Sequence, residues 1–340
     1  IAYNRVMRPS IWLAATLVLG CGGEREAPPP SPAPVAEAAA STPSSSALAP
    51  TASPSVRLAF VGDLCMSLKV GVQLSRRFHG QKSAPHVGPH YPFDHVQPRL
   101  RDADLLVGNL ECVAGSGGEI SVAHHPFRCG PRTPELLLRE GFDLVSVANN
   151  HARDFGDRGL YGMVRKLDEV GLAHVGRESH VRQPMAPSIH VLDGLRVGVL
   201  AYYFSPQSMR DVVAARPHVD FLAVFMHWGI ENERDVHPHQ RKLAHDFIDH
   251  GVDLVVGAHT HVIQPTEWYR ERFIAYGLGN FVFSGMTDTE AHQLGALLEV
   301  DVDLATKKAS PRMTRIRLDY DGVPHWEDEP DDSPVLSPPS

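Results

Sequence analysis

The stretch "GVDLVVGAHTHVIQP", residues 251–265, follows a helical pattern, continues as a buried strand and ends with two histidines close together. In the preceding segment Pro238–His250, apolar side chains recur at the spacing of one helix face. Asp253–Val256 is a short apolar and β-branched run, which is typical of a strand buried on both faces. A helix followed by a buried strand predicts an α/β protein. Whether His259 and His261 bind metal depends on what surrounds them.

Short apolar runs alternate with longer amphipathic segments along most of the chain. Gly156–Val170 has helical spacing and is followed by Gly171, a helix stop. Ser188–Leu192 and Arg196–Ala201 flank an Asp193-Gly194 turn and predict a β-hairpin. We predict one α/β domain with two sheets packed face to face and covered by helices. Further strands are expected at Val56–Val61, Asp104–Val107, Asp143–Ala148, Phe221–Met226, Phe273–Tyr276, Asn280–Ser284, Ala296–Asp303 and Met313–Asp319.

Polar residues able to bind metal follow five of the buried strands at their carboxyl ends. Each alone has an ordinary explanation, because a strand-end Asp commonly caps a helix and an Asn pair is usual in turns. In open α/β sheets, however, ligand sites lie outside the carboxyl ends of the strands, so these side chains are expected to meet. They are Asp63, Glu111, Asn149, Asn150, His151, His227, His259 and His261.

This set of nitrogen and oxygen ligands predicts a metal site without a thiolate cluster. Imidazole and carboxylate ligands suit Mn, Fe or Zn better than a structural zinc site built on cysteines. An amide oxygen and a bridging carboxylate favour two divalent ions over one. The formal net charge of −8 argues against a nucleic-acid-binding surface, because the chain has no basic excess to neutralise phosphates.

The amino-terminal part has the composition of a secretory signal and a linker. Residues 1–21 combine a short basic start with an apolar run too short to span a bilayer, which predicts a signal peptide. Val18-Leu19-Gly20-Cys21 resembles a lipobox, in which Cys21 is lipidated; the alternative is a plain signal peptide with an incidental cysteine. Residues 22–55 are rich in Ala, Pro and Ser and predict a disordered tether.

The remaining chain divides into a catalytic domain over residues 56–320 and an acidic, proline-rich tail over residues 321–340. A lipid-anchored protein of the cell envelope is expected, at the outer membrane or in the periplasm if the host is Gram-negative. In that oxidising compartment, Cys112 and Cys129 are a candidate disulfide and Cys65 the free thiol.

Six stretches, in this order, resemble the CapA family of poly-γ-glutamate or capsule synthesis proteins, within the calcineurin-like metallophosphoesterase superfamily. The resemblance runs from about residue 56 to 320 and implies a four-layer α/β/β/α sandwich. The stretches are "FVGDLCMS" (60–67), "DLLVGNLECVAG" (104–115), "GFDLVSVANNHARDFGDRGL" (141–160), "HWGIENE" (227–233), "GVDLVVGAHTHVIQP" (251–265) and "IAYGLGNFVFS" (274–284).

The resemblance also implies a role for each residue of the predicted metal site. The implied ligands are Asp63 and His261 for a first metal, Glu111 as the bridge, and Asn150, His227 and His259 for a second metal, with His151 as the catalytic histidine. The two histidines of the opening stretch would therefore bind different ions.

Some residues are further candidates for the site. Cys65 stands where the superfamily usually has a histidine ligand. Asn149 precedes the implied ligand Asn150, and Asn280 is expected to hydrogen-bond the metal loop. Glu231 is expected to hold a ligand imidazole or to contact a cationic substrate; the alternative is a solvated loop carboxylate. Asp154 is expected to fix the loop after His151.

The resemblance implies a metal-dependent hydrolase that acts on a phosphoester or on a glutamyl or peptide amide. His151 would stabilise or protonate the leaving group, while the metals lower the pKa of a water molecule. The substrate would be an anionic polymer or a small phosphoester or peptide. The alternative is a non-catalytic metal-binding accessory protein for assembly or export of an anionic capsule polymer. The presence of His151 favours the enzyme, because a binding protein needs no catalytic histidine.

Overall fold

The structure of this chain is a computed structural model, and it describes five stretches of the sequence. The predicted signal peptide, its candidate lipidation site Cys21 and most of the predicted tether lie outside them. Among the described residues, no helix is both long enough and apolar enough to cross a bilayer. The described residues are 54–81, 87–121, 125–176, 185–204 and 208–327.

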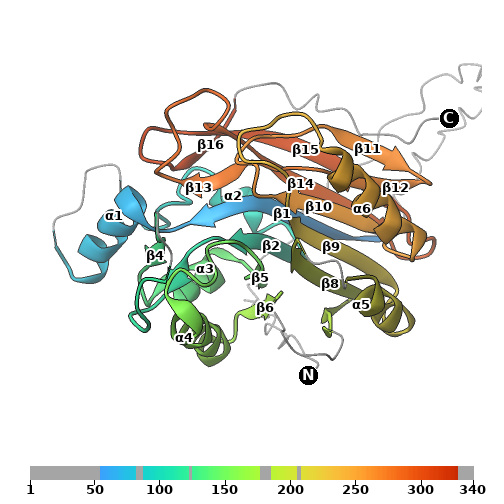
Figure 1. Cartoon of the computed structure of the whole chain (residues 1–340), viewed down its shortest axis with the longest axis horizontal. Coiled ribbons are helices and arrows are strands. Elements are labelled where there is room, and N and C mark those ends of the chain that lie inside the picture. Colours follow the sequence, from blue (N-terminus) through green and yellow to red (C-terminus); the bar gives the residue numbers. More distant parts are fainter. Residues whose placement is uncertain (1–53, 82–86, 122–124, 177–184, 205–207, 328–340) are drawn as a thin grey trace, which may run out of the picture. The chain divides into compact units, whose positions relative to one another are not determined.

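The first sheet has eight strands in the order β16-β15-β14-β1-β2-β5-β6, with β13 also paired to β1 (Figure 1). Strands β1, β2, β5 and β6 run parallel, as do β1 and β13, whereas β14, β15 and β16 join antiparallel. The bounds are β1 Ser55–Cys65, β2 Leu105–Leu110, β5 Leu144–Ser146, β6 Ala173–Val175, β13 Asn280–Phe283, β14 Leu294–Asp303, β15 Ala309–Leu318 and β16 Pro324–Trp326.

The second sheet has six strands in the order β11-β12-β10-β9-β8-β7, and only its two edge pairs are antiparallel. The predicted hairpin is β7–β8, and Asp193 and Gly194 both have positive φ, as its tight turn requires. The bounds are β7 Ser188–Leu192, β8 Leu195–Tyr203, β9 Phe221–His227, β10 Leu254–Ala258, β11 Thr266–Tyr269 and β12 Arg272–Ala275. A separate short pair consists of β3 Val113–Ala114 and β4 Arg128–Cys129.

The alternation of side chains along each strand builds the layers. On β1, Leu58 and Phe60 pack between the two sheets, whereas Ala59 and Val61 belong to the core beneath the helices of the first sheet. On β9, Phe225 lies between the sheets, and its ring meets that of Phe60 edge-on at 6.2 Å. Both sheets therefore bury both faces, which explains why their strands are almost continuously apolar.

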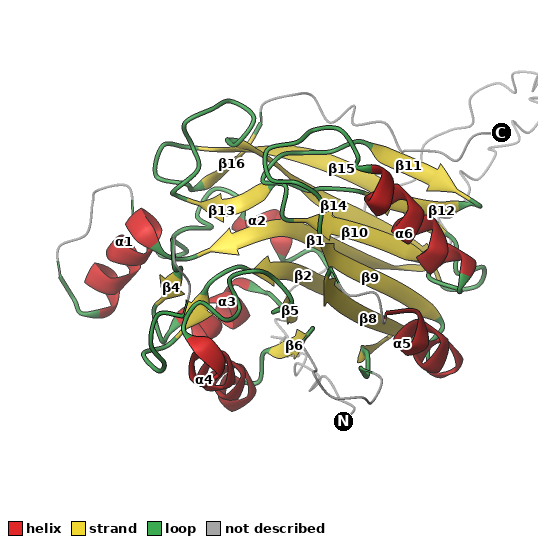
Figure 2. Ribbon diagram, viewed as in Figure 1, coloured by secondary structure: helices red, strands yellow, loops and turns green. Residues whose placement is uncertain are grey.

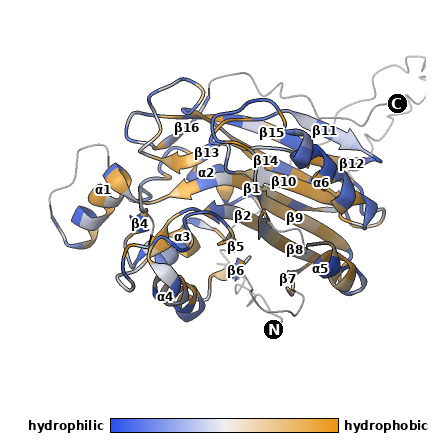
Figure 3. Cartoon of the chain, in the orientation of Figure 1, coloured by the Kyte–Doolittle hydropathy of each residue, from blue (hydrophilic) through white to orange (hydrophobic). Residues whose placement is uncertain are grey.

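Helices cover the two outer faces, as Figure 2 shows. Buried side chains of the first four helices pack on the first sheet, and those of the last two pack on the second. Figure 3 shows hydrophobic and hydrophilic residues together on α6, as expected for a helix with one buried face. The predicted α/β/β/α sandwich is confirmed. The bounds are α1 Leu68–Phe78, α2 Gln97–Leu100, α3 Thr133–Glu140, α4 Gly156–Val170, α5 Ser208–Ala215 and α6 Pro238–Asp249, with a 3-10 turn η1 at Arg216–His218.

The structure corrects the sequence analysis at two points. Strand β16 lies beyond residue 320, where we placed the start of the tail, and it pairs with β15 through Ile316 and Trp326. The sheet therefore continues to Trp326, and residues 328–340 lie outside the described part. The strand expected over Asp143–Ala148 spans only Leu144–Ser146. The other short strands β3, β4, β6 and β11 had no sequence signal that we recognised.

Candidate metal centre

The carboxyl ends of strands from both sheets meet at one edge. In the first sheet, Asp63 near the end of β1 pairs in register with Asn109 near the end of β2, and also with Asn280 at the start of β13. In the second sheet, His227 at the end of β9 pairs with Ala258 at the end of β10, so the following residue His259 lies beside it. The parallel pairing brings these strand ends together, as the sequence predicts.

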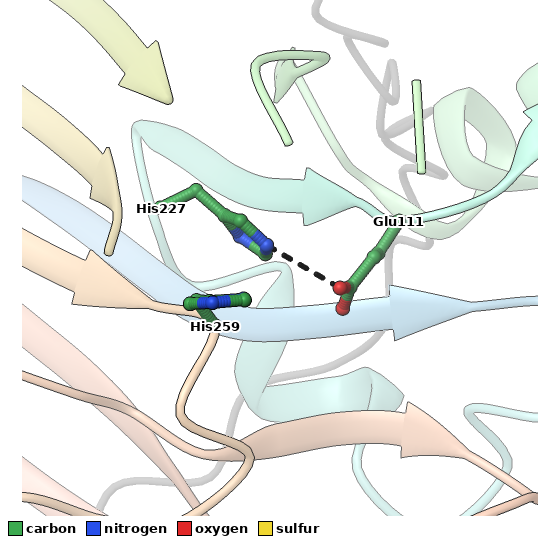
Figure 4. A group of neighbouring side chains, drawn as sticks. All are labelled: Glu111, His227 and His259. Atoms are coloured by element: carbon green, nitrogen blue, oxygen red, sulfur yellow. Dashed lines mark ion pairs between the residues drawn. The ribbon is translucent and has the colours of Figure 1, made fainter. Parts of the chain in front are cut away.

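Five side chains form two groups that share Glu111. One group is Glu111, His227 and His259, and the other is Asp63, Glu111 and His261. In each group the potential ligand atoms lie within 4.8 Å of one another, and all five residues are buried. Figure 4 shows the first group, in which His227 Nε2 lies 3.4 Å from Glu111 Oε1. This grouping matches the bridging role that the resemblance implies for Glu111.

The hydrogen bonding of Glu111 tests whether these residues fit a metal ion. Its side chain is fully buried, and within the described residues neither carboxylate oxygen has a hydrogen-bond partner. The same holds for His259 Nδ1. Burial, together with the charge of Asp63, raises the pKa of Glu111 well above its ordinary value. A buried carboxylate without a partner is costly, so two orphaned oxygens directed at histidines fit divalent cations.

Asp63 and His261 form the polar half of the site. Asp63 accepts hydrogen bonds from Asn109 Nδ2 at 2.7 Å and from the backbone N–H of His259 at 3.2 Å. Burial would raise the pKa of Asp63, but His261, with Nδ1 3.4 Å away, lowers it to about 2. Conversely, burial would lower the pKa of His261, but Glu111 and Asp63 raise it to about 10. Without metal, therefore, Asp63 and His261 form an ion pair.

His227 and His259 form the neutral half. Burial lowers the pKa of each to about 3, so both imidazoles are uncharged, which is the form that binds metal. His227 Nε2 lies 2.7 Å from Asn150 Oδ1, which places the amide oxygen of Asn150 beside this group. The backbone φ is 92° at His259 and 58° at His261, a conformation that costs energy for residues other than glycine. This turn directs the two histidines to different groups.

His151 lies at the margin of the site on the turn after β5. Its Nδ1 is 2.8 Å from Asp154 Oδ2, and its ring lies 4.3 Å from that of Phe127. Burial would lower the pKa of His151, but the hydrogen bond to Asp154 and the charge of Glu111 raise it. His151 belongs to neither metal group of the described residues.

Two of the further candidates, Asn149 and Asn280, hydrogen-bond residues of the site. Asn149 donates to Asn109 Oδ1 at 3.1 Å and to the carbonyl of Leu110 at 2.9 Å, while its own Oδ1 accepts from the backbone of His151. Asn280 Oδ1 lies 2.8 Å from His261 Nδ1, as expected for a residue that orients the metal loop.

The other two candidates lie outside both groups. Cys65 is buried, its Sγ is 3.0 Å from Ser67 Oγ, and burial raises its pKa to about 12, so the thiol is a poor ligand. Glu231 is exposed, and its charge acts on His227 and His259. Cys112 and Cys129 form a disulfide, with Cα atoms 5.8 Å apart, and Cys65 is the free cysteine among the described residues, as predicted.

Sequence reasoning missed two residues that support the site. Asn109 connects Asp63, Asn149 and His227, and its place at a strand end in "GNLE" is a signal that identifies it. Phe127 packs on His151 from a segment 24 positions away, between Cys112 and Cys129, and no local pattern indicates that contact.

Comparison with known proteins gives a consistent set of matches. The family model described as "Bacterial capsule synthesis protein PGA_cap" matches residues 57–285. The chain is 27% identical over 297 residues to the capsule biosynthesis protein CapA of Bacillus anthracis, covering 76% of this chain and 72% of that protein. It is 28% identical over 254 residues to the PGA biosynthesis protein CapA of Bacillus subtilis, covering 68% of this chain and 64% of that protein.

A third relative is the probable polyglutamine synthesis accessory protein of Mycobacterium tuberculosis, 28% identical over 244 residues. The match covers 62% of this chain and 64% of that protein. The chain thus spans less than two thirds of the length of the second and third relatives.

Proposed function

Because this chain belongs to the bacterial capsule synthesis protein family, whose model matches residues 57–285, we propose that it is a dinuclear metal hydrolase of capsule or poly-γ-glutamate metabolism. The bond cleaved is a phosphoester or the amide of a glutamyl or peptide substrate. The observation that carries the proposal is the buried Glu111, whose two oxygens lack hydrogen-bond partners among the described residues and which belongs to both ligand groups.

The roles of the residues follow from their environments. Asp63 and His261 would hold one ion, His227, His259 and Asn150 the other, and Glu111 both. When bound, such ions supply positive charge and lower the pKa of water at the site. The Nδ1 of His151 is hydrogen-bonded to Asp154, so Nε2 is the nitrogen that donates a proton to the leaving group. The raised pKa of His151 keeps more of it protonated near neutral pH.

The proposal includes attachment to the cell envelope through a lipid on Cys21. Its support is the lipobox-like sequence Val18-Leu19-Gly20-Cys21 together with the Ala, Pro and Ser composition of residues 22–55. Membrane fractionation of cells that express the full chain tests this part, and recovery of all the protein in the soluble fraction would refute it.

A pair of variants tests the catalytic part. His151→Ala should keep the bound metal and lose about 10² to 10⁴ in kcat, because it removes a proton donor that is not a ligand. His259→Ala should lose metal as well as turnover. The measurements are metal analysis of the purified chain and turnover on a panel of phosphoester and glutamyl-amide substrates. Full activity in both variants would contradict both residue roles and, with them, the metal-dependent mechanism proposed here.

The second candidate function is a non-catalytic accessory protein that binds metal and an anionic polymer during its assembly or export. The Mycobacterium tuberculosis relative is named a probable polyglutamine synthesis accessory protein, which favours this candidate. Metal binding without turnover on any substrate of the panel, with polymer binding that depends on His259 but not on His151, would support this candidate instead.

A further inference from the structure

Phe127 contacts both partners of the His151–Asp154 pair. Its ring centroid lies 4.3 Å from that of His151, with the ring planes inclined by 38°. Its backbone N–H donates to Asp154 Oδ2 at 2.6 Å, the same oxygen that lies 2.8 Å from His151 Nδ1. Any movement of Phe127 therefore changes the packing of the imidazole and the position of the carboxylate that orients it.

The β3–β4 pair fixes Phe127, which directly precedes β4. The backbone N–H of Val113 donates to the carbonyl of Phe127 at 2.8 Å, and that of Gly115 donates to the carbonyl of Cys129 at 3.2 Å. The guanidinium of Arg128 donates to the carbonyls of Gly115 at 2.7 Å and Gly117 at 3.0 Å. These bonds hold two very short strands together.

The disulfide connects this pair to the metal centre. Cys112 directly follows Glu111, and its partner Cys129 is the second residue after Phe127. Both cysteines are buried, with at most 1% of their surface exposed. The bridge therefore ties the segment that carries Phe127 to the residue beside Glu111 by a covalent link.

Ser121 and Phe283 make further contacts around the turn that carries His151. Ser121 donates its backbone N–H to the carbonyl of Asp154 at 2.8 Å, and its Oγ accepts from the backbone of Gly156 at 3.1 Å. The ring of Phe127 also lies 5.4 Å from that of Phe283, which is 5.0 Å from the ring of His261. Phe127 thus lies against the His151 turn and, through Phe283, beside the group of Asp63, Glu111 and His261.

We propose that Cys112, Cys129 and Phe127 are positioning residues for His151, and that the disulfide holds the proton donor against the metal centre. This inference rests on the proposed hydrolase. His151 lies on a turn rather than on a strand or helix, so the position of its side chain depends on the residues that pack against it. A small displacement of a catalytic group costs on the order of a hundredfold in rate. Removal of the disulfide should therefore lower kcat, because it lets His151 move.

The first test is the double variant Cys112→Ala/Cys129→Ala in the full chain. We expect kcat to fall roughly ten- to a hundredfold, with metal content unchanged and KM altered less than about threefold. Hydrogen exchange of the amides of residues 151–156 should become at least about tenfold faster, because the contacts that hold this turn loosen.

A matched control separates positioning from general loss of stability. Phe247→Ala removes a buried side chain beneath the second sheet, on the opposite outer layer, at a comparable cost in stability. It should leave kcat and exchange at residues 151–156 unchanged. An equal fall in kcat in Phe247→Ala would overturn the positioning role.

A second pair of variants keeps the disulfide and so remains informative if the cysteine variant does not fold. Phe127→Leu removes the aromatic contact with His151 and should lower kcat by about tenfold with metal retained. Phe127→Tyr keeps the ring and should restore at least half of the kcat. Equal activity of the wild-type chain and Phe127→Leu would overturn the proposal.

The outcomes also separate this inference from the proposed function. If the wild-type chain binds metal but turns over no substrate, the proposed hydrolase function is refuted. Hydrogen exchange at residues 151–156 then still tests whether the disulfide holds the His151 turn in place. If wild-type turnover is present but neither kcat nor exchange responds to loss of the bridge, the hydrolase stands and the positioning role fails.

Discussion

At the scale of single residues, Asn280 determines the orientation of His261. Its Oδ1 lies 2.8 Å from His261 Nδ1, which leaves Nε2 as the nitrogen on the side of Glu111, 4.0 Å from Oε1. Residues that hydrogen-bond a metal-binding histidine fix its tautomer and ring orientation, and their loss typically weakens metal binding ten- to a hundredfold. Asn280 is itself fully buried, so water does not replace it easily.

Asn280→Ala should weaken metal binding by roughly ten- to a hundredfold, because His261 loses the acceptor that fixes its ring. Asn280→Asp keeps an oxygen acceptor at the same place and should retain most of the affinity. Titration calorimetry of the metal-free chain with Mn²⁺ or Zn²⁺ measures both. An affinity of Asn280→Ala within twofold of the wild type would contradict this role.

At the scale of elements, β10 approaches its neighbours too closely at Gly257 for any side chain. A Cβ at this position would lie 1.9 Å from the carbonyl oxygen of Tyr276 and 2.5 Å from Trp228 Nε1. Trp228 Nε1 donates to that same carbonyl at 2.9 Å. The glycine therefore lets the strand that leads to His259 pack beside β9 and the segment after β12.

Gly257→Ala should destabilise the metal-free protein by roughly 3 kcal/mol, because the backbone of Tyr276 has to move. Gly162→Ala on α4 is the matched control, since a Cβ there meets no heavy atom within 4 Å. It should stabilise the protein by up to about 1 kcal/mol, the difference in helix propensity. Urea unfolding measures both, and equal midpoints for the two variants would refute the steric argument.

The elements that could be predicted are those with strong periodicity or continuous burial. The helix predicted over Gly156–Val170 has those bounds in the structure, and the one predicted over Pro238–His250 ends one residue earlier. The strands β3 and β6, with two and three residues, gave no pattern that we recognised. β16 lies in an acidic, proline-rich segment and forms because its backbone pairs with the edge strand β15.

The site could be predicted as far as parallel strand ends determine it. The five side chains meet because they lie near or just after the carboxyl ends of strands in parallel pairs. Asp63 lies two residues before the end of β1, His227 ends β9, and Glu111, His259 and His261 follow β2 and β10. The positive φ of the two last histidines could not be predicted, because it comes from the turn between β10 and β11. The contact of Phe127 with His151 could not be predicted either, because it depends on how the loop between Cys112 and Cys129 folds back toward the site.

At the scale of the whole domain, the candidate metal centre takes its residues from both sheets. Asp63 and Glu111 come from the ends of β1 and β2, whereas His227, His259 and His261 follow β9 and β10. An ion held between them binds only the folded arrangement, so its binding energy adds to the stability of the domain. The inter-sheet core beneath the site, with Phe60 against Phe225, supplies the rigid support for the ligands.

We propose that Glu111 bridges two metal ions, and the metal content of the purified chain tests this role most directly. After loading with Mn²⁺, Fe²⁺ or Zn²⁺ and removal of excess ion, elemental analysis should find two ions per chain. Glu111→Gln, which keeps the shape but removes the charge, should lose both ions, because both groups contain this carboxylate. Two ions retained in Glu111→Gln, or fewer than two in the wild-type chain, would contradict the account.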